Sequence, residues 1–165
     1  LERNGLEPGG YYLAVGRFVP ENNYETMIRE FMASGTRRPF ALVTGVDEGF
    51  LDELEKRTGF RGDPRIRFVG TVYDQELLKK VREGASLAST RLSLLLDVGF
   101  NREVAEDAAL YWTKEEGSLG WLINTAEQLH DEAILEYRRS STHVVEDHYS
   151  WNYIATKYES LYQII

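Results

Sequence analysis

The residues best suited to bind an anion lie near the start of the chain. An apolar run, Tyr11–Val15, stops at Gly16, and Arg17 follows at once. Glycine lets the backbone turn sharply, and an arginine at such a turn can make a two-pronged, charge-assisted contact with a phosphate. The helix predicted after Asn23 would add free N–H groups and the positive end of its dipole. The spacing thus fits a phosphate-holding turn.

A second interpretation of the same residues stays open, and spacing alone favours it. Gly16 and Arg17 are a two-residue signal, which a strand-end turn with a solvated arginine explains equally well. The chain contains neither a Gly-x-Gly-x-x-Gly fingerprint nor a Walker loop, so an ordinary dinucleotide or P-loop site is not supported.

Two further candidates follow later apolar runs, where open α/β sheets bind their ligands. In the first, the backbone of Thr71 and Val72 together with the Tyr73 ring could flank a planar base. A tight strand-to-helix turn, with Tyr73 packed on the following helix, is the alternative. In the second, Asp97 and Asn101 could meet a sugar hydroxyl, or Asn101 could simply cap a helix.

Composition narrows the classes of function. The chain has 165 residues, a net charge of −8 and no cysteine, so one domain is expected and thiolate chemistry is excluded. The acidity argues against a general nucleic-acid binder. The three histidines share no metal-ligand spacing, and we expect neither a metal nor a cofactor. No apolar run is long enough to span a bilayer. The absence of cysteine is compatible with a reducing cytoplasm, and we expect a cytoplasmic protein.

Apolar periodicity predicts strands that alternate with helices, and hence a parallel sheet. Asn22 or Asn23 is expected to cap the first helix, Asp74 to begin another, and Ser150 to cap a final amphipathic helix. Two polar helices are predicted at about 116–124 and 127–138, with a break after Arg139. The predicted strands are Tyr11–Val15, Phe40–Thr44, Ile66–Val69, Leu92–Val98 and Ala108–Trp112.

Four stretches together resemble the C-terminal domain of family-four glycosyltransferases with the GT-B fold. They keep the family's order and begin at Gly16 (Gly-Arg-Phe-Val-Pro-Glu-Asn-Asn-Tyr-Glu-Thr-Met-Ile), Arg67 (Arg-Phe-Val-Gly-Thr-Val-Tyr), Leu94 (Leu-Leu-Leu-Asp-Val-Gly-Phe-Asn-Arg-Glu-Val) and Tyr149 (Tyr-Ser-Trp-Asn-Tyr-Ile-Ala-Thr-Lys-Tyr-Glu). The chain is most similar to the rhamnosyltransferases of bacterial capsule and cell-wall polysaccharide synthesis.

This resemblance implies a Rossmann-like parallel sheet with helices on both faces. Residues 1–10 would be a linker from an N-terminal domain, 11–148 the donor-binding domain, and 149–165 a helix that packs on this domain or crosses to the other one. The implied partners are a nucleotide-sugar such as dTDP-rhamnose and a glycan acceptor, which can be lipid-linked. Transfer without a metal, at the inner face of the membrane, is the implied reaction.

The resemblance also assigns roles to single residues. Gly16, Arg17 and Asn22 would form the donor diphosphate site, with Arg17 in contact with the phosphates, and the Thr71–Tyr73 backbone would lie beside the base. The family's lysine five positions after the arginine is here Asn22, so the second phosphate cation is absent.

A larger departure from the family lies between Glu83 and Ala88, where one strand-helix unit is largely missing, either as a loop left out of the given sequence or as a true deletion. Family members have there a His-Gly-His-Glu-like loop and a helix with a second glutamate, which together hold the donor sugar. Catalytic residues are expected in that unit and in the N-terminal domain, so this chain should be inactive alone. A non-catalytic α/β interaction module remains the alternative, and a flavodoxin-like binder is a weaker one.

Overall fold

The computed structural model describes residues 6–7, 9–70, 92–150 and 155. Its strands are β1 (Tyr12–Val15), β2 (Phe40–Val43), β3 (Ile66–Phe68), β4 (Leu94–Leu96) and β5 (Leu110–Trp112). Its α-helices are α1 (Tyr24–Ala33), α2 (Glu48–Thr58), α4 (Gly99–Ala105), α5 (Ser118–Ala126) and α6 (Asp131–Tyr149). Short 3₁₀ turns lie at η2 (Pro20–Asn22) and η3 (Phe60–Gly62). The alternation of strands and helices confirms the predicted α/β class.

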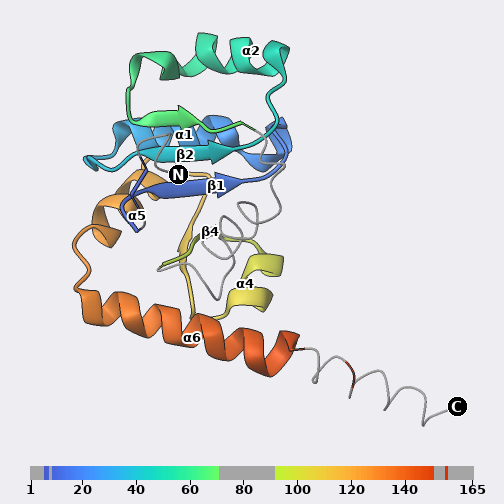
Figure 1. Cartoon of the computed structure of the whole chain (residues 1–165), viewed down its shortest axis with the longest axis vertical. Helices are drawn as coiled ribbons and strands as arrows, with labels where there is room; N and C mark the ends of the chain where they lie inside the picture. Colours follow the sequence, from blue (N-terminus) through green and yellow to red (C-terminus); the bar gives the residue numbers. More distant parts are fainter. Residues whose placement is uncertain (1–5, 8, 71–91, 151–154, 156–165) are drawn as a thin grey trace, which may run out of the picture.

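All described strand pairs are parallel. Strands β1, β2 and β3 form one sheet in that order, and β4 pairs with β5 in a second. In Figure 1 the arrowheads of β1–β3 point the same way, and α4, which directly follows β4, lies on the side to which they point. The carboxyl ends of these strands therefore form one edge of the molecule.

Strand β2 is the buried centre of the three-stranded sheet. Its four residues Phe-Ala-Leu-Val are all buried, as a parallel strand covered on both faces should be. Phe40 and Leu42 face the main core cluster, whereas Ala41 and Val43 alternate to the opposite face and are buried as well.

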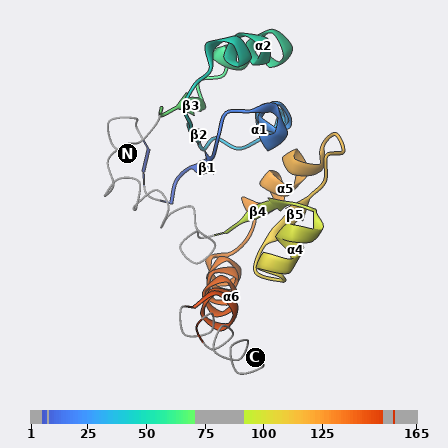
Figure 2. The same cartoon turned by 90° about the vertical axis from the view of Figure 1, so that its right-hand side faces the viewer.

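Helix α1 lies beside the three-stranded sheet and packs against α5, which also contacts β5 (Figures 1 and 2). The prediction of a polar helix at 116–124 is wrong, because α5 buries most of its surface. Polar residues cluster just before it, and its apolar residues have the three- and four-residue spacing of a buried helical face. Those buried residues are Leu119, Leu122, Ile123 and Ala126.

The predicted break after Arg139 is also wrong, since α6 runs through it to Tyr149. Ser141 and Thr142 suggest a break, but their hydroxyls donate to the carbonyls of Tyr137 and Arg138, one turn earlier in the same helix. Ser141 is buried and also donates to the Ala108 carbonyl before β5. The helix thus satisfies these hydroxyls without ending.

Three predictions about secondary structure fall outside the described residues. They are the helix that begins at Asp74, the missing unit between Glu83 and Ala88, and all of the final helix except Ala155, which is helical. Among the described helices, none is both long and apolar enough to cross a membrane.

Candidate functional site

The candidate site is the edge formed by the carboxyl ends of the parallel strands. Figure 2 looks onto this edge, with β1, β2 and β3 seen end-on and α4 near the viewer. The loops after β1, β2 and β3 each leave the sheet here, beginning at Gly16, Thr44 and Val69. Ligands of open α/β sheets bind at this kind of edge, because backbone groups are free there and helices begin there.

Gly16 closes β1 and places its backbone next to β2. Its N–H donates to the Val43 carbonyl at 3.4 Å, which is the last ladder bond between the two strands. A methyl group built at Gly16 would lie 3.5 Å from both the Asn22 Nδ2 and the Tyr24 hydroxyl, so an alanine would touch them at ordinary contact distance. The turn is therefore compact, although glycine is not sterically obligatory in it.

Phe18 anchors the loop that carries Arg17. The ring is buried among three other rings, with centroid distances of 4.7 Å to Phe50, 4.9 Å to Tyr24 and 5.5 Å to Phe68. These partners come from α2, α1 and β3, so one side chain ties the loop to three elements. Arg17, the residue before the anchor, is exposed.

Asn22 supports the same loop from the other side. Its Nδ2 donates to the Arg17 carbonyl at 2.7 Å, and the Val19 N–H donates to the same oxygen at 3.0 Å. The prediction that Asn22 or Asn23 caps α1 with its side chain is wrong. Asn23 does precede the helix, but with a positive φ of 57° and without a side-chain bond to a helical N–H.

Tyr24 and Thr44 belong to this edge and were not predicted as site residues. The Tyr24 side chain is buried, and its hydroxyl forms a side-chain hydrogen bond with Thr44, which directly follows β2. Burial raises the pKa of the Tyr24 phenol, while the bond with Thr44 partly opposes the rise. A hydroxyl residue directly after a wholly apolar strand was the available signal for Thr44.

The predicted base-binding residues Thr71, Val72 and Tyr73 lie outside the described residues, so their role stays a prediction. The described backbone leads toward them. The Val69 N–H donates to the Leu42 carbonyl at 2.9 Å, and Gly70 has a φ of 78°, which favours glycine. The chain thus turns away from β3 at the same edge.

Asp97 and Asn101 lie at the carboxyl end of β4, where both have intramolecular partners. Both Asp97 oxygens accept from Arg102, at 2.7 and 2.8 Å, and this pair lowers the pKa of the Asp97 carboxyl. The Arg102 guanidinium also lies 3.9 Å from the centre of the Tyr111 ring. Asn101 caps no helix, since its Nδ2 donates to the Leu96 carbonyl of β4 at 2.8 Å. Contact with a sugar stays a prediction.

Arg17 differs from most arginines of the described part in having no carboxylate partner there. Several other arginines of the described part pair with carboxylates within 4 Å, as in Arg38 with Glu127 and Arg65 with Asp63. Arg17 makes no side-chain hydrogen bond or ion pair that involves the described residues. Its positive charge is therefore available to an external anion.

A group of three or more metal-ligating side chains does not occur within residues 6–7, 9–70, 92–150 and 155. His143 pairs with Asp147 one turn later in α6, and the His148 Nε2 lies 3.6 Å from the Glu106 Oε1.

Comparison with known proteins adds a structural likeness. No protein-family model matches the chain, and no curated protein matches it by sequence. The crystal structure of HepE from Anabaena, in complex with UDP and glucose, matches it with a TM-score of 0.70 and 16% sequence identity. The match covers 93% of this chain and 49% of HepE, so the chain spans about half the length of that protein.

A likeness at this identity concerns the fold. It agrees with the order of elements above, in which parallel strands alternate with helices and loops gather at one edge. The chain has an α/β fold that matches half of a GT-B glycosyltransferase.

Proposed function

We propose that this chain is the nucleotide-sugar-binding domain of a glycosyltransferase. The observation that carries the proposal is the likeness, over 93% of the chain, to a protein crystallised with UDP and glucose. The four sequence stretches that resemble family-four glycosyltransferases support it independently, because they were identified from residues rather than from the fold.

In this proposal the diphosphate binds at the turn after β1. The Arg17 guanidinium is exposed and has no carboxylate partner in the described part, and the buried Phe18 ring fixes its backbone. A pyrophosphate offers an arginine several oxygens for two-pronged, charge-assisted contacts. Gly16 lies in the same turn, and α1 begins a few residues later with its positive end toward this edge.

The proposed donor is a nucleotide-activated rhamnose such as dTDP-rhamnose, and the proposed acceptor is a glycan that can be lipid-linked. Both rest on the sequence resemblance to the rhamnosyltransferases of polysaccharide synthesis. Asp97 and Asn101 are proposed to face the sugar, and Thr71–Tyr73 the base. Because the chain spans about half of HepE, transfer itself would require the partner domain.

Isothermal titration of the chain with UDP and with dTDP tests the proposal. We expect heat from at least one of them at micromolar to millimolar ligand, and weaker binding of the matching nucleoside. Absence of heat from either nucleotide at millimolar concentration, with the protein shown to be folded by circular dichroism, would reject the function.

A non-catalytic interaction module is the second candidate, and one observation favours it. Phe100 on α4 is 73% exposed and Trp121 on α5 is 67% exposed, which is unusual for large apolar side chains. The same titration separates the candidates, because an interaction module has no reason to prefer a nucleoside diphosphate over a nucleoside.

A further inference from the structure

We propose that Asn22 is a positioning residue of the anion-binding turn, and that it acts on the ligand only through Arg17. This inference rests on the proposed function, since it concerns how the diphosphate-binding cation is held. The observation behind it is the 2.7 Å hydrogen bond from the Asn22 Nδ2 to the Arg17 carbonyl. The amide N–H that donates to this carbonyl is not available to donate to a phosphate oxygen.

The bond closes a loop of defined shape. Arg17 lies at the end of β1, and Asn22 is the last residue of the 3₁₀ turn η2, five positions later. Within that span, the Val19 N–H donates to the Arg17 carbonyl at 3.0 Å and the Asn22 N–H donates to the Val19 carbonyl at 3.1 Å. The Arg17 carbonyl thus accepts two hydrogen bonds, and its orientation is fixed by both.

A second, independent constraint holds the residue next to Arg17. The Phe18 ring is 5% exposed and contacts three aromatic rings from different elements. With the Arg17 carbonyl held by Asn22 and the next side chain anchored in the core, the Arg17 backbone has little freedom. With the backbone already held, only the Arg17 side chain has to be ordered when an anion binds, which lowers the entropy lost on binding.

This arrangement explains how the turn can function with one cation. A lysine at position 22 would supply a second charge but could not form the same neutral amide brace. Asn22 instead holds the backbone of the loop that carries the Arg17 guanidinium. Asn22 then contributes to affinity without contacting the ligand.

A double-mutant cycle on the whole chain tests this mechanism, with UDP, dTDP and inorganic pyrophosphate as titrants. Asn22→Ala should weaken the nucleotide that binds by about fivefold, the effect of losing one hydrogen bond. Arg17→Ala should weaken it by about tenfold or more, as expected for a charge-assisted contact. In the double variant, Asn22→Ala should add no further loss, because the residue it positions is gone.

The control is Asn124→Ala, which also removes one side-chain bond to the backbone, the 2.9 Å bond from the Gly35 N–H to Asn124 Oδ1. It should leave nucleotide affinity unchanged, and thermal unfolding of all variants reports any general loss of stability.

The results of these titrations distinguish the role of Asn22 from the proposed function. Additive losses in the double variant would show that Asn22 contacts the ligand itself, and would overturn the positioning role while leaving the proposed function in place. Unchanged affinity in Asn22→Ala would also overturn the positioning role alone. If the unsubstituted chain binds none of the titrants, the proposed function fails, and the role of Asn22 fails with it.

Discussion

At the scale of residues, ion pairs in this acidic protein mostly serve the fold. Arg65 is the clearest case, because its guanidinium donates to the carbonyls of Met32, Ser34 and Thr36 as well as to Asp63. These carbonyls lie at and just beyond the end of α1, where they have no partner within the helix. A cation committed in this way cannot serve a ligand, which sets Arg17 apart.

Asp63→Asn should make the free energy of unfolding less dependent on pH in the acidic range. Arg65 lowers the pKa of the Asp63 carboxyl, so the pair stabilises the folded state above the unfolded pKa of about 3.9. That contribution is lost as pH falls through the lower folded value. Urea unfolding should therefore show the variant less stable by about 1 kcal/mol at pH 7, with the difference shrinking below pH ~4.

Asp52→Asn is the matched control, since Asp52 pairs with Arg61 at 3.0 Å but with both side chains about half exposed. It should change stability by less than about 0.5 kcal/mol at pH 7. An Asp63→Asn difference that stays constant down to pH ~2.5 would contradict the linkage.

Single residues also show where sequence reasoning reached its limit. Gly16 and Arg17 could be singled out because an apolar strand, a turn and a cation are contiguous in the chain. The role of Asn22 could not, since an asparagine before a helix is ordinarily a cap and only the folded loop brings its amide to the Arg17 carbonyl. Thr44 was missed because its partner, Tyr24, belongs to a different element.

At the scale of elements, local interactions define both ends of α2. Asp47 precedes the helix and its Oδ1 accepts the Phe50 N–H at 2.8 Å, which satisfies one free donor of the first turn. Gly59 ends the helix with a φ of 66°, a conformation that costs residues with a side chain more than glycine. Both ends are thus set by residues within one turn of the helix.

Asp47→Ala should therefore destabilise the protein by about 1 kcal/mol, the usual cost of a lost cap. Asp47→Asn should restore most of this, because an amide oxygen can accept the same bond. Thermal unfolding monitored by circular dichroism measures both. Equal melting temperatures for Asp47→Ala and the unsubstituted protein would mean that the cap contributes nothing.

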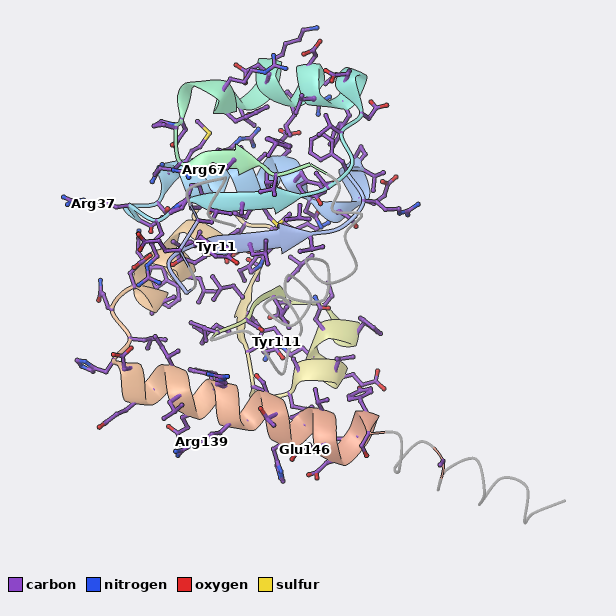
Figure 3. The ribbon with its side chains drawn as sticks, viewed as in Figure 1. Tyr11, Arg37, Arg67, Tyr111, Arg139 and Glu146 are labelled. Atoms are coloured by element: carbon purple, nitrogen blue, oxygen red, sulfur yellow. The ribbon has the colours of Figure 1, made fainter. Side chains whose placement is uncertain are left out.

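Helices α5 and α6 were mispredicted because their surroundings are not local. The character of α5 is set by its contact with α1, and α6 continues past Arg139 because Ser141 finds partners in its own previous turn and in the Ala108 carbonyl. Neither the helix partner nor that carbonyl is visible from a window of neighbouring residues. Figure 3 shows Arg139 and Glu146 on the outer side of α6, away from the sheet.

At the scale of the whole molecule, α1 and α5 join the two parts of the structure through one buried carboxylate. Glu30 is 5% exposed, and its two oxygens accept the N–H groups of Gly117 and Gly120 at 2.8 and 2.9 Å. These donors belong to the first turn of α5, where a negative charge is also favoured by the helix dipole. A methyl group at Gly120 would lie 3.2 Å from the Glu30 carbonyl, which shows how closely the helices approach.

A second contact supports the same junction. Glu127, directly after α5, accepts hydrogen bonds from the hydroxyls of Tyr12 and Thr36 at 3.0 and 2.6 Å, and pairs with Arg38 at 3.2 Å. Burial and the nearby carboxylate raise the pKa of the Tyr12 phenol, so the phenol stays protonated as a donor. Contacts between residues so distant in sequence could not be predicted from it.

Glu30→Ala should destabilise the protein by about 2–4 kcal/mol, because it leaves two buried N–H groups without an acceptor. Glu30→Gln keeps one acceptor oxygen and should cost less. Urea unfolding measures the loss, and the exposed Glu116→Ala serves as a control with the same change of charge. A loss no larger than that of the control would mean that the junction does not depend on Glu30.

The central claim is that Arg17 provides the cation for a nucleoside diphosphate, and a charge-matched comparison tests it most directly. Arg37 is an exposed arginine at the end of the sheet opposite the arrowheads of β1–β3 (Figure 3). Arg17→Ala and Arg37→Ala remove the same charge, so any difference between them reflects position rather than net charge. Both variants are titrated with UDP, dTDP and the matching nucleosides.

Arg17→Ala should weaken binding of the nucleotide by about tenfold or more and leave binding of its nucleoside nearly unchanged, while Arg37→Ala should change neither. Equal losses of nucleotide and nucleoside in Arg17→Ala, or equal losses in the two variants, would contradict the central claim.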